Sequence, residues 1–223
     1  MGLYVYCFTP AGHGPGPDIA GVAGNPVSLL ASGKLALWVD LRESVPDATL
    51  RSVKAHHAVV EAAWSTSPAC LPARFGQWFH GHDALEESLA EKRPALEQAL
   101  ARVEGAAEHG VRIADPRAST SDEAHVPSGR AYLELLRQQA SVREERDRRG
   151  EALGVELEAA LGDAVREQRS EPLPTRHGLL SVSHLVPRER QQDYVERLGA
   201  FRGRHPELRF LTSGPWPPYS FAP

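Results

Sequence analysis

The sequence predicts an α+β protein of two domains that are divided near residue 105. Short strand-like runs separated by Gly/Pro turns open the chain, helical patterns follow, and the strand pattern begins again at Ala107. Hydrophobic residues make up 41% of the 223 residues, which is enough apolar material to bury a core in each part. We therefore predict a mixed α+β domain with antiparallel strands over residues 1–105 and a second α+β domain over residues 106–223.

The first domain is expected to begin with strands. Residues 1–8 are a run of β-branched and aromatic residues, and shorter strand-like runs follow at 18–22, 27–30 and 35–39. Such closely spaced strands are typical of an antiparallel meander. Alternating glycines and prolines at residues 10–17 deny that stretch any regular structure.

Two helices are expected next. Ser44 can cap the first, and its apolar side chains recur at steps of three and four, which defines one helical face. These side chains are Leu50, Val53, His57, Val60 and Trp64. Residues 68–76 should be extended, because each proline disfavours helix at and before it. Asp83 and Glu86 form a capping-box pattern for the second helix, and Pro94 is expected to kink or split it. Its predicted apolar face consists of Leu85, Leu89, Leu96, Leu100 and Val103.

The second half of the chain has the element order β-α-β-α-β. This order fits a reduced ferredoxin-like unit, in which the long helix packs on a sheet. The middle of the long helix, residues 143–149, is almost wholly charged and is expected on a solvated face. The predicted strands are 107–113, 178–186 and 208–211, and the predicted helices are 128–169 and 188–204. Apolar side chains recur at four-residue steps in the long helix, at Leu153, Leu157, Leu161 and Val165.

Composition and charge exclude several classes of protein. The net charge is −4 and the pI is near 6.2, so no excess of positive charge is available to neutralise the phosphates of a nucleic acid. Cys7 and Cys70 lie in apolar runs and are expected to be free, buried thiols in a reducing compartment. The N-terminus lacks the pattern of a signal peptide, and no apolar stretch is long enough to cross a bilayer. We expect a cytoplasmic protein without a nucleic-acid or membrane partner.

No pattern in the sequence predicts catalysis, a metal or a cofactor. A phosphate-binding loop is excluded because Leu35 stands where its hydroxyl-bearing residue is needed. The pair His56-His57, with Glu61 one turn further on, matches no zinc framework. We expect no enzymatic activity. Two other classes stay open: a small-molecule-binding ferredoxin-like regulatory module, and a metal-dependent enzyme that uses the histidines.

Two segments rich in aromatic residues carry the candidate site. Residues 71–79 place an arginine among large rings, and residues 213–221 end in three aromatic residues on a proline frame. These side chains either staple the fold or contact a partner. The candidates are Arg74, Phe75, Trp78, Trp216, Tyr219 and Phe221.

Specific arrangements are expected for both segments. A carboxylate or backbone carbonyls should hold Arg74, while Phe75 should pack between the first helix and the sheet. The tail, residues 214–223, should be ordered although it continues neither helix nor strand, because its prolines lower the entropy lost on fixing it. We expect the tail to fold back onto the C-terminal domain, with Trp216 as the main anchor.

Five segments of the chain, in order, resemble signatures of the GvpF/GvpL family of gas vesicle proteins. Each alone is weak, but the ending is specific and the set spans residues 3–221. The segments are Leu3–Tyr6, Leu71–Gly76, Ser128–Leu133, Leu180–Val186 and Ser213–Phe221.

The resemblance implies an α+β protein whose C-terminal domain is a modified ferredoxin fold with an extended tail. It implies a role in forming gas vesicles, the gas-filled protein shells that give cells buoyancy, as an assembly factor or minor structural protein without catalytic residues. It further implies contact with the hydrophobic shell protein GvpA and other gas vesicle accessory proteins, with the gas-facing surface of the shell as a location. The resemblance does not separate GvpF from GvpL.

Overall fold

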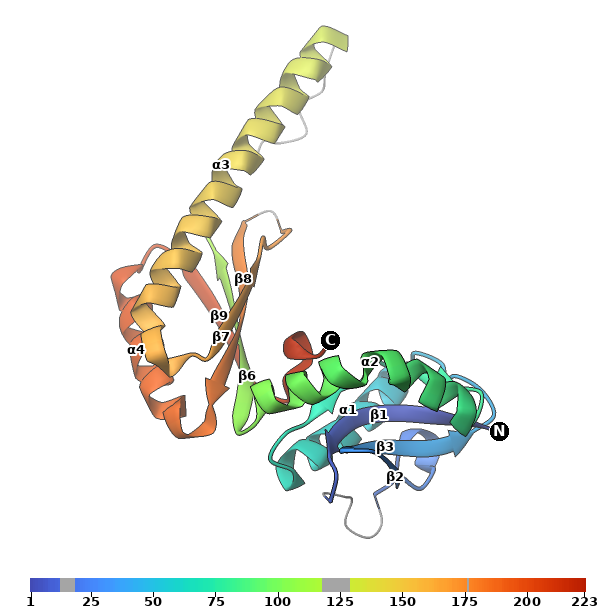
Figure 1. The fold of residues 1–223 in the computed structure, drawn as a ribbon. Helices are drawn as coiled ribbons and strands as arrows, with labels where there is room; N and C mark the ends of the chain where they lie inside the picture. The colour runs from blue at the N-terminus through green and yellow to red at the C-terminus, as the bar shows by residue number, and fades with distance from the viewer. Residues whose placement is uncertain (13–18, 118–128, 176) are drawn as a thin grey trace. The chain divides into compact units, whose positions relative to one another are not determined.

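The computed structural model describes residues 1–12, 19–117, 129–175 and 177–223, with only the backbone described for the helical residues 129–132 (Figure 1). The described residues form two compact units. The first contains residues 1–108 together with 215–223, and the second contains residues 109–214. The α+β class with antiparallel strands is confirmed.

The first unit is built on one sheet with the strand order β2-β3-β1-β4, and β5 also pairs with β1. β1 pairs antiparallel with β3, β4 and β5, and β2 pairs antiparallel with β3. The strand predicted at 18–22 is instead a single bridge, Ala20 to Pro26, around a 3₁₀ turn. The strands are β1 (Gly2–Pro10), β2 (Ser28–Ser32), β3 (Leu35–Arg42), β4 (Leu71–Pro72) and β5 (Trp78–Phe79).

β1 is the central strand of this sheet and is buried on both faces. Residues 2–9 are all buried, and side chains alternate between the two faces of a strand. Both helices of the unit, α1 (Leu50–Thr66) and α2 (His82–Val103), contact β1. The sheet is therefore covered by other parts of the unit on each side of β1.

Polar side chains of β1 are satisfied inside the unit. The Tyr6 hydroxyl donates to Asp40 Oδ2 at 2.5 Å and accepts from the Val22 N–H at 2.8 Å. Asp40 is fully buried and also receives two hydrogen bonds from the Arg42 guanidinium, at 2.8 and 2.6 Å. Arg42 in turn lies 4.7 Å from the ring centroid of Tyr4. These bonds compensate the cost of burying a carboxylate and a phenol.

His56 links α1 to the same network. Its Nε2 lies 3.2 Å from the Ala73 carbonyl oxygen, an acceptor, so Nε2 carries the proton. Its Nδ1 then accepts from the Tyr4 hydroxyl at 2.8 Å, and that hydroxyl accepts from the Gly76 N–H at 3.3 Å. The neutral imidazole therefore joins α1, β1 and the segment that follows β4.

The buried face of α1 differs from the predicted one. The buried side chains are His56, Val59, Val60 and Ala63. Leu50 and Val53, which belong to the predicted apolar face, are 71% and 42% exposed. The helix also begins later than predicted, because Thr49 and not Ser44 caps it, accepting from the Ser52 N–H at 3.1 Å. The spacing of three and four residues correctly predicted a helix, but the stripe of side chains that it identified lies beside the stripe that is buried.

α2 matches its predicted apolar face. It runs from His82 to Val103 with Pro94 inside one continuous helix, so the expected split does not occur, and Gly81 makes no side-chain cap at its start. The buried side chains are Leu85, Leu89, Leu96, Ala99, Leu100 and Val103.

The second unit has the element order β-α-β-β-α-β, which is the complete ferredoxin-like order. Its sheet has the strand order β7-β8-β6-β9. The predicted order was one strand short, because the long helix ends at Leu161 and not at Arg169, and β7 follows it. The elements are β6 (Ala106–Ala114), α3 (Gly129–Leu161), β7 (Glu167–Glu171), β8 (Gly178–Pro187), α4 (Gln191–Arg204) and β9 (Arg209–Trp216).

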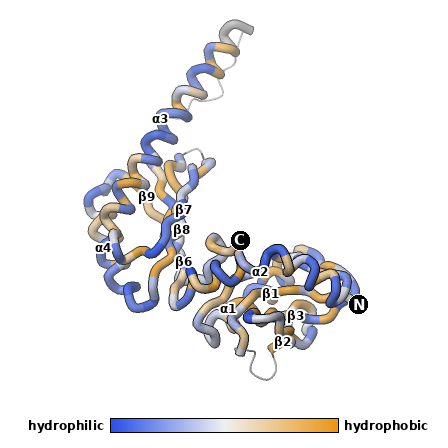
Figure 2. Tube along the Cα trace, viewed as in Figure 1, coloured by the Kyte–Doolittle hydropathy of each residue, from blue (hydrophilic) through white to orange (hydrophobic). Residues whose placement is uncertain are grey.

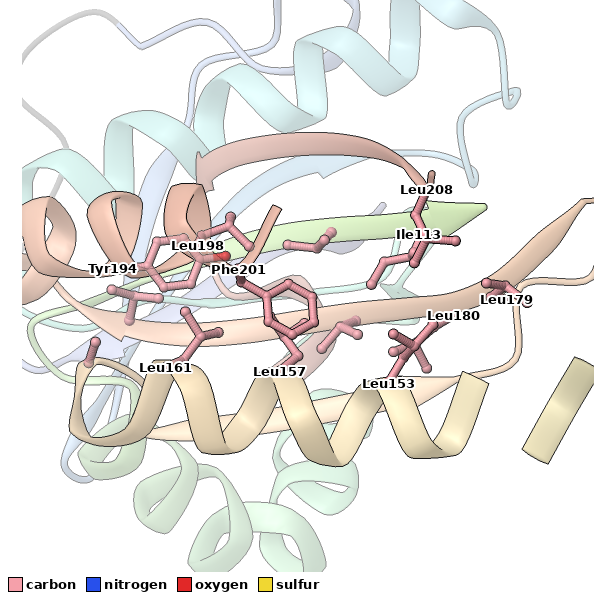
Figure 3. Close-up of a cluster of buried hydrophobic side chains, with 14 residues drawn as sticks. Ile113, Leu153, Leu157, Leu161, Leu179, Leu180, Tyr194, Leu198, Phe201 and Leu208 are labelled. Atoms are coloured by element: carbon pink, nitrogen blue, oxygen red, sulfur yellow. The ribbon is translucent and has the colours of Figure 1, made fainter. Parts of the chain in front are cut away.

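The core of the second unit lies between its helices and its sheet (Figure 3). Leu153, Leu157 and Leu161 project from α3 at the predicted four-residue steps, and Tyr194, Leu198 and Phe201 come from α4. Facing them are Ile113 of β6 and Leu180, Val182 and Val186 of β8. A Cβ at Gly150 would collide with the carbonyl oxygen of Leu179, so a glycine there lets α3 approach β8 closely.

The part of α3 before this core extends past the sheet (Figure 1). Residues 133–145 are exposed except for Leu135, and hydrophilic and hydrophobic residues alternate along this stretch in Figure 2. Arg143 pairs with Asp147 at 3.7 Å, and Arg148 pairs with Glu145 one turn away. The charged run 143–149 is exposed as predicted except for Arg146 and Asp147, which are half-buried.

His184 is a fully buried titratable group in the second unit. Its Nε2 donates to Gln168 Oε1 at 3.0 Å, and its Nδ1 accepts from the Tyr194 hydroxyl at 3.0 Å. Burial, with a smaller contribution from His109, lowers the pKa of His184 from 6.5 to about 4. Burial likewise lowers the pKa of His56 to about 4. Both units therefore bury a histidine in its neutral form.

Acidification should destabilise the protein as the pH falls through 6.5 toward 4. In that window the unfolded chain binds a proton at each of these histidines and the folded protein does not, so each contributes a loss of about 1.4 kcal/mol per pH unit. Urea unfolding of the wild type and of His184→Gln at about pH 7.5 and about pH 5 tests this. The variant should be less stable at the higher pH but show a smaller acid-induced drop. An equal drop in both proteins would contradict the assignment.

Candidate partner-binding surface

The tail packs on the first unit. It forms a short 3₁₀ turn, Tyr219–Phe221, and the Phe221 side chain is fully buried. The Glu108 carboxylate accepts from the Ser220 N–H at 2.7 Å and from the Ser220 hydroxyl at 2.6 Å. Arg102 of α2 donates to the Phe221 carbonyl at 2.8 Å. The tail is therefore ordered by one buried ring and by charged groups that bind its backbone.

This arrangement corrects three expectations about the tail. It lies on the first unit and not on the C-terminal part, and Phe221 is its anchor, whereas Trp216 is 41% exposed. The tail also begins as a strand, because β9 continues to Trp216. The buried carboxylate of Glu108 explains the location, since a charge that is taken out of water requires hydrogen-bond donors and the tail supplies two.

Two tail rings stay at the surface, against α1. The Tyr219 hydroxyl lies 2.8 Å from His57 Nδ1, and the Trp216 ring centroid lies 5.9 Å from that of His57. Trp216 and Tyr219 are 41% and 39% exposed. Val53 and Leu50 precede His57 by one and two turns on the same stripe of α1.

These five side chains define what we call the α1–tail surface: Leu50, Val53, His57, Trp216 and Tyr219. It combines aliphatic and aromatic groups on a helix and on a proline-rich tail. Glu61, which lies 3.3 Å from His57 Nε2, places a carboxylate beside it. The residues of α1 and those of the tail each stand out in the sequence, but no pattern predicted that they lie side by side.

The segment after β4 is held by its backbone. The Ala73 N–H donates to the Tyr6 carbonyl at 2.8 Å, and the Ala73 carbonyl accepts from His56. Phe75 is half-buried, with its ring centroid 6.2 Å from that of Tyr4 on β1 and 5.7 Å from that of His56 on α1. The expected position of Phe75 between the first helix and the sheet agrees with these contacts.

Arg74 and Trp78 differ in their surroundings. Arg74 is exposed, and within the described residues no carboxylate or carbonyl holds its side chain as was expected. Trp78 is half-buried on β5, where its Nε1 donates to the Arg42 carbonyl at 3.4 Å and its ring lies 4.7 Å from that of His80. Trp78 therefore belongs to the sheet, and Arg74 lies at the surface beside Phe75.

Asp40, Arg42 and His56 are structural residues that sequence analysis did not single out. Asp40 and Arg42 end an apolar strand two residues apart, a spacing that places both on one face of the strand. That spacing was the available signal. His56 lacked one, because its neighbour His57 fitted the apolar stripe better.

The metal-ligating side chains, thiols and long helices of the described residues bear on other classes of function. Within them, no three His, Cys, Asp or Glu side chains gather in a way that could hold a metal ion. Cys7 and Cys70 are both buried and free, and burial raises the pKa of the Cys7 thiol. In the same part of the chain, no helix is long and apolar enough to cross a membrane.

Phe221→Ala should lower the free energy of unfolding by about 3–5 kcal/mol, because it removes a fully buried ring. Trp216→Ala should cost less than about 1 kcal/mol, because that ring is 41% exposed. Chemical denaturation of the two variants is the measurement, and each serves as the control for the other. A larger loss for Trp216→Ala would restore Trp216 as the anchor.

Comparisons with known proteins agree with the resemblance seen in the sequence. The family model described as gas vesicle synthesis protein GvpL/GvpF matches residues 2–223. Gas vesicle protein L of a Streptomyces species is 32% identical, with 98% of this chain and 92% of that protein covered. Gas vesicle protein F2 of Halobacterium salinarum is 25% identical, with 98% and 91% covered.

Solved structures extend the likeness to the fold. The crystal structure of GvpF from Anabaena sp. PCC7120 superposes with a TM-score of 0.77 at 18% identity, covering 100% of this chain and 98% of that one. GvpF from Microcystis aeruginosa gives a TM-score of 0.74, also at 18% identity, with 100% and 99% covered. The family model matches nearly the whole sequence, and the chain therefore belongs to the GvpL/GvpF family of gas vesicle synthesis proteins.

Proposed function

We propose that the protein is a non-enzymatic assembly factor of gas vesicles that binds the hydrophobic shell protein GvpA through the α1–tail surface. Family membership supplies the gas vesicle role. The observation that supports the binding surface is the group of exposed apolar side chains on α1 and the tail, led by Leu50 and Trp216 at 71% and 41% exposure. Exposed apolar patches on a soluble protein mark interaction sites.

The composition of the surface suits this task. Trp and Tyr supply large contact areas and are enriched at the energetic centres of protein interfaces. The Tyr219 hydroxyl is held by His57, and Phe221 anchors the turn that carries Tyr219. Fixing the two rings before a partner arrives reduces the entropy cost of binding.

A reason for such a surface follows from the chemistry of the partner. A small, very hydrophobic shell protein would aggregate before it is assembled, and a soluble protein that covers its apolar face would prevent this. We place this action in the cytoplasm during assembly, with the gas-facing surface of the shell as the site where the complex is retained.

Leu50→Asp should abolish capture of GvpA without unfolding the protein. Leu50 is 71% exposed and is the first residue of α1, where a carboxylate interacts favourably with the helix dipole. Val155→Asp is the matched control, because Val155 is 69% exposed on α3, outside the α1–tail surface. Affinity-tagged GvpA, co-expressed with each variant, should retain at least about tenfold less Leu50→Asp than Val155→Asp.

A functional assay complements the capture. A vesicle-producing host in which the gene is deleted should regain pressure-sensitive light scattering with Val155→Asp and fail to do so with Leu50→Asp. Equal capture and equal rescue by both variants would exclude the α1–tail surface as the binding site. Loss of rescue with normal capture would show that GvpA binding occurs elsewhere on the protein.

A further inference from the structure

A separate surface lies on the second unit, between the end of α4 and the start of β9. It is an open groove of about 660 Å³, lined from α4 by Gly199, Arg202 and Gly203 and from the chain that follows by Leu208, Arg209 and Phe210. A Cβ on Gly199 or Gly203 would meet nothing within 4 Å, so both glycines face open space. The wall formed by α4 is therefore shallow and accessible.

The strand beside this groove is the outer strand of its sheet. β9 follows β6 at the end of the order β7-β8-β6-β9. All residues of β9 except Phe210 are exposed, and Leu211 is 64% exposed. An outer strand presents backbone N–H and C=O groups that an added strand can pair with. An extended peptide that adds to such an edge uses a groove beside it for alternate side chains.

The groove is also positively charged in a protein of net charge −4. Arg202 and Arg209 line it, and within the described residues neither has a carboxylate partner. Arg197 of the same unit shows the contrasting case, since it binds Asp193 at 2.8 Å and Asp163 at 2.9 Å. His205 also lines the groove, but two carboxylates lie beside its ring: Glu156 is 3.0 Å from its Nε2 and Glu207 is 3.7 Å from its Nδ1.

The dipole of α4 explains only part of this charge. Basic side chains in the last turn of a helix interact favourably with its C-terminal carbonyls, and Arg202 and Arg204 occupy that turn. Arg209 lies on β9 and has no such role. Arg202 lies 5.9 Å from the Phe210 ring centroid, an arrangement that leaves the N–H edge of its guanidinium available to a carboxylate.

We infer that this groove binds an extended acidic segment of a partner protein, which adds to β9 as a strand and places carboxylates on Arg202 and Arg209. The proposal concerns a second surface and does not depend on the α1–tail surface. Charge selects the occupant, because two arginines on the wall of the groove attract an acidic segment and repel a basic one. The exposed edge of β9 selects an extended backbone.

Gly203→Leu is the decisive variant. A Cβ at this position meets nothing within 4 Å, so the leucine side chain can occupy part of the groove. Replacing a helical glycine also raises helix propensity, so the variant should be at least as stable as the wild type. The probe is a fluorescein-labelled octapeptide of alternating Glu and Val. Fluorescence anisotropy should show binding to the wild type that weakens as salt rises from about 50 to about 300 mM, and at least about tenfold weaker binding to Gly203→Leu.

Charge reversal provides the second arm. Arg202→Glu should bind the acidic peptide with at least about tenfold lower affinity than the wild type does. It should bind an octapeptide of alternating Lys and Val with higher affinity than the wild type does. Arg204→Glu is the matched control, because Arg204 is in the same turn but its guanidinium lies over Phe201, 5.4 Å from the ring centroid. It should change the affinity by less than about threefold. An acidic peptide with N-methylated backbone should bind poorly to the wild type.

Several results would overturn the inference. Binding that is unaffected by Gly203→Leu would exclude the groove as the binding site. Equal binding of the acidic and basic peptides would exclude charge as the basis of selectivity. Full affinity of the N-methylated peptide would exclude strand addition. Binding of an oligothymidine instead of the peptide, or a dimer in sedimentation that Gly203→Leu abolishes, would assign the surface to a nucleic acid or to a second copy.

Discussion

Burial of β1 on both faces is the constraint on which the first unit depends. A strand in that position must be apolar or must find partners inside for every polar group, because water cannot reach it. β1 carries two tyrosines, and the unit supplies those partners: Asp40 and the Val22 N–H for Tyr6, and His56 and the Gly76 N–H for Tyr4.

The same constraint fixes segments that have little regular structure of their own. The chain after β4 is short of helix and strand, yet Ala73 and Gly76 bind the network through their backbone atoms. Gly76 has a φ of +91°, a left-handed conformation that favours glycine. The position of Phe75 at the edge of this network is thus a consequence of how β1 satisfies its hydroxyls.

Much of the fold could be predicted because apolar periodicity reports directly on burial. The leucines of α2 and the four-residue steps of α3 face their cores as expected. β7 could not be found in this way, because Glu167–Glu171 is an outer strand with mostly exposed side chains and carries no apolar alternation. The face of α1 was misjudged because a buried polar residue, His56, takes a core position that hydrophobic spacing cannot recognise. The candidate site shows the same limit, since the residues that place the tail, Glu108 and Arg102, are charged.

The division of the first unit into residues 1–108 and 215–223 has a consequence for biogenesis. A ribosome releases β1 to α2 first, then the whole of the second unit, and only then the turn that carries Phe221. Until that moment Glu108 lacks the donors of Ser220, and the site that Phe221 fills has no occupant. A chain interrupted anywhere between the two pieces would leave the first unit unfinished and would display that defect to chaperones and proteases. Because of the tail, the first unit can complete its fold only after the second unit has been synthesised.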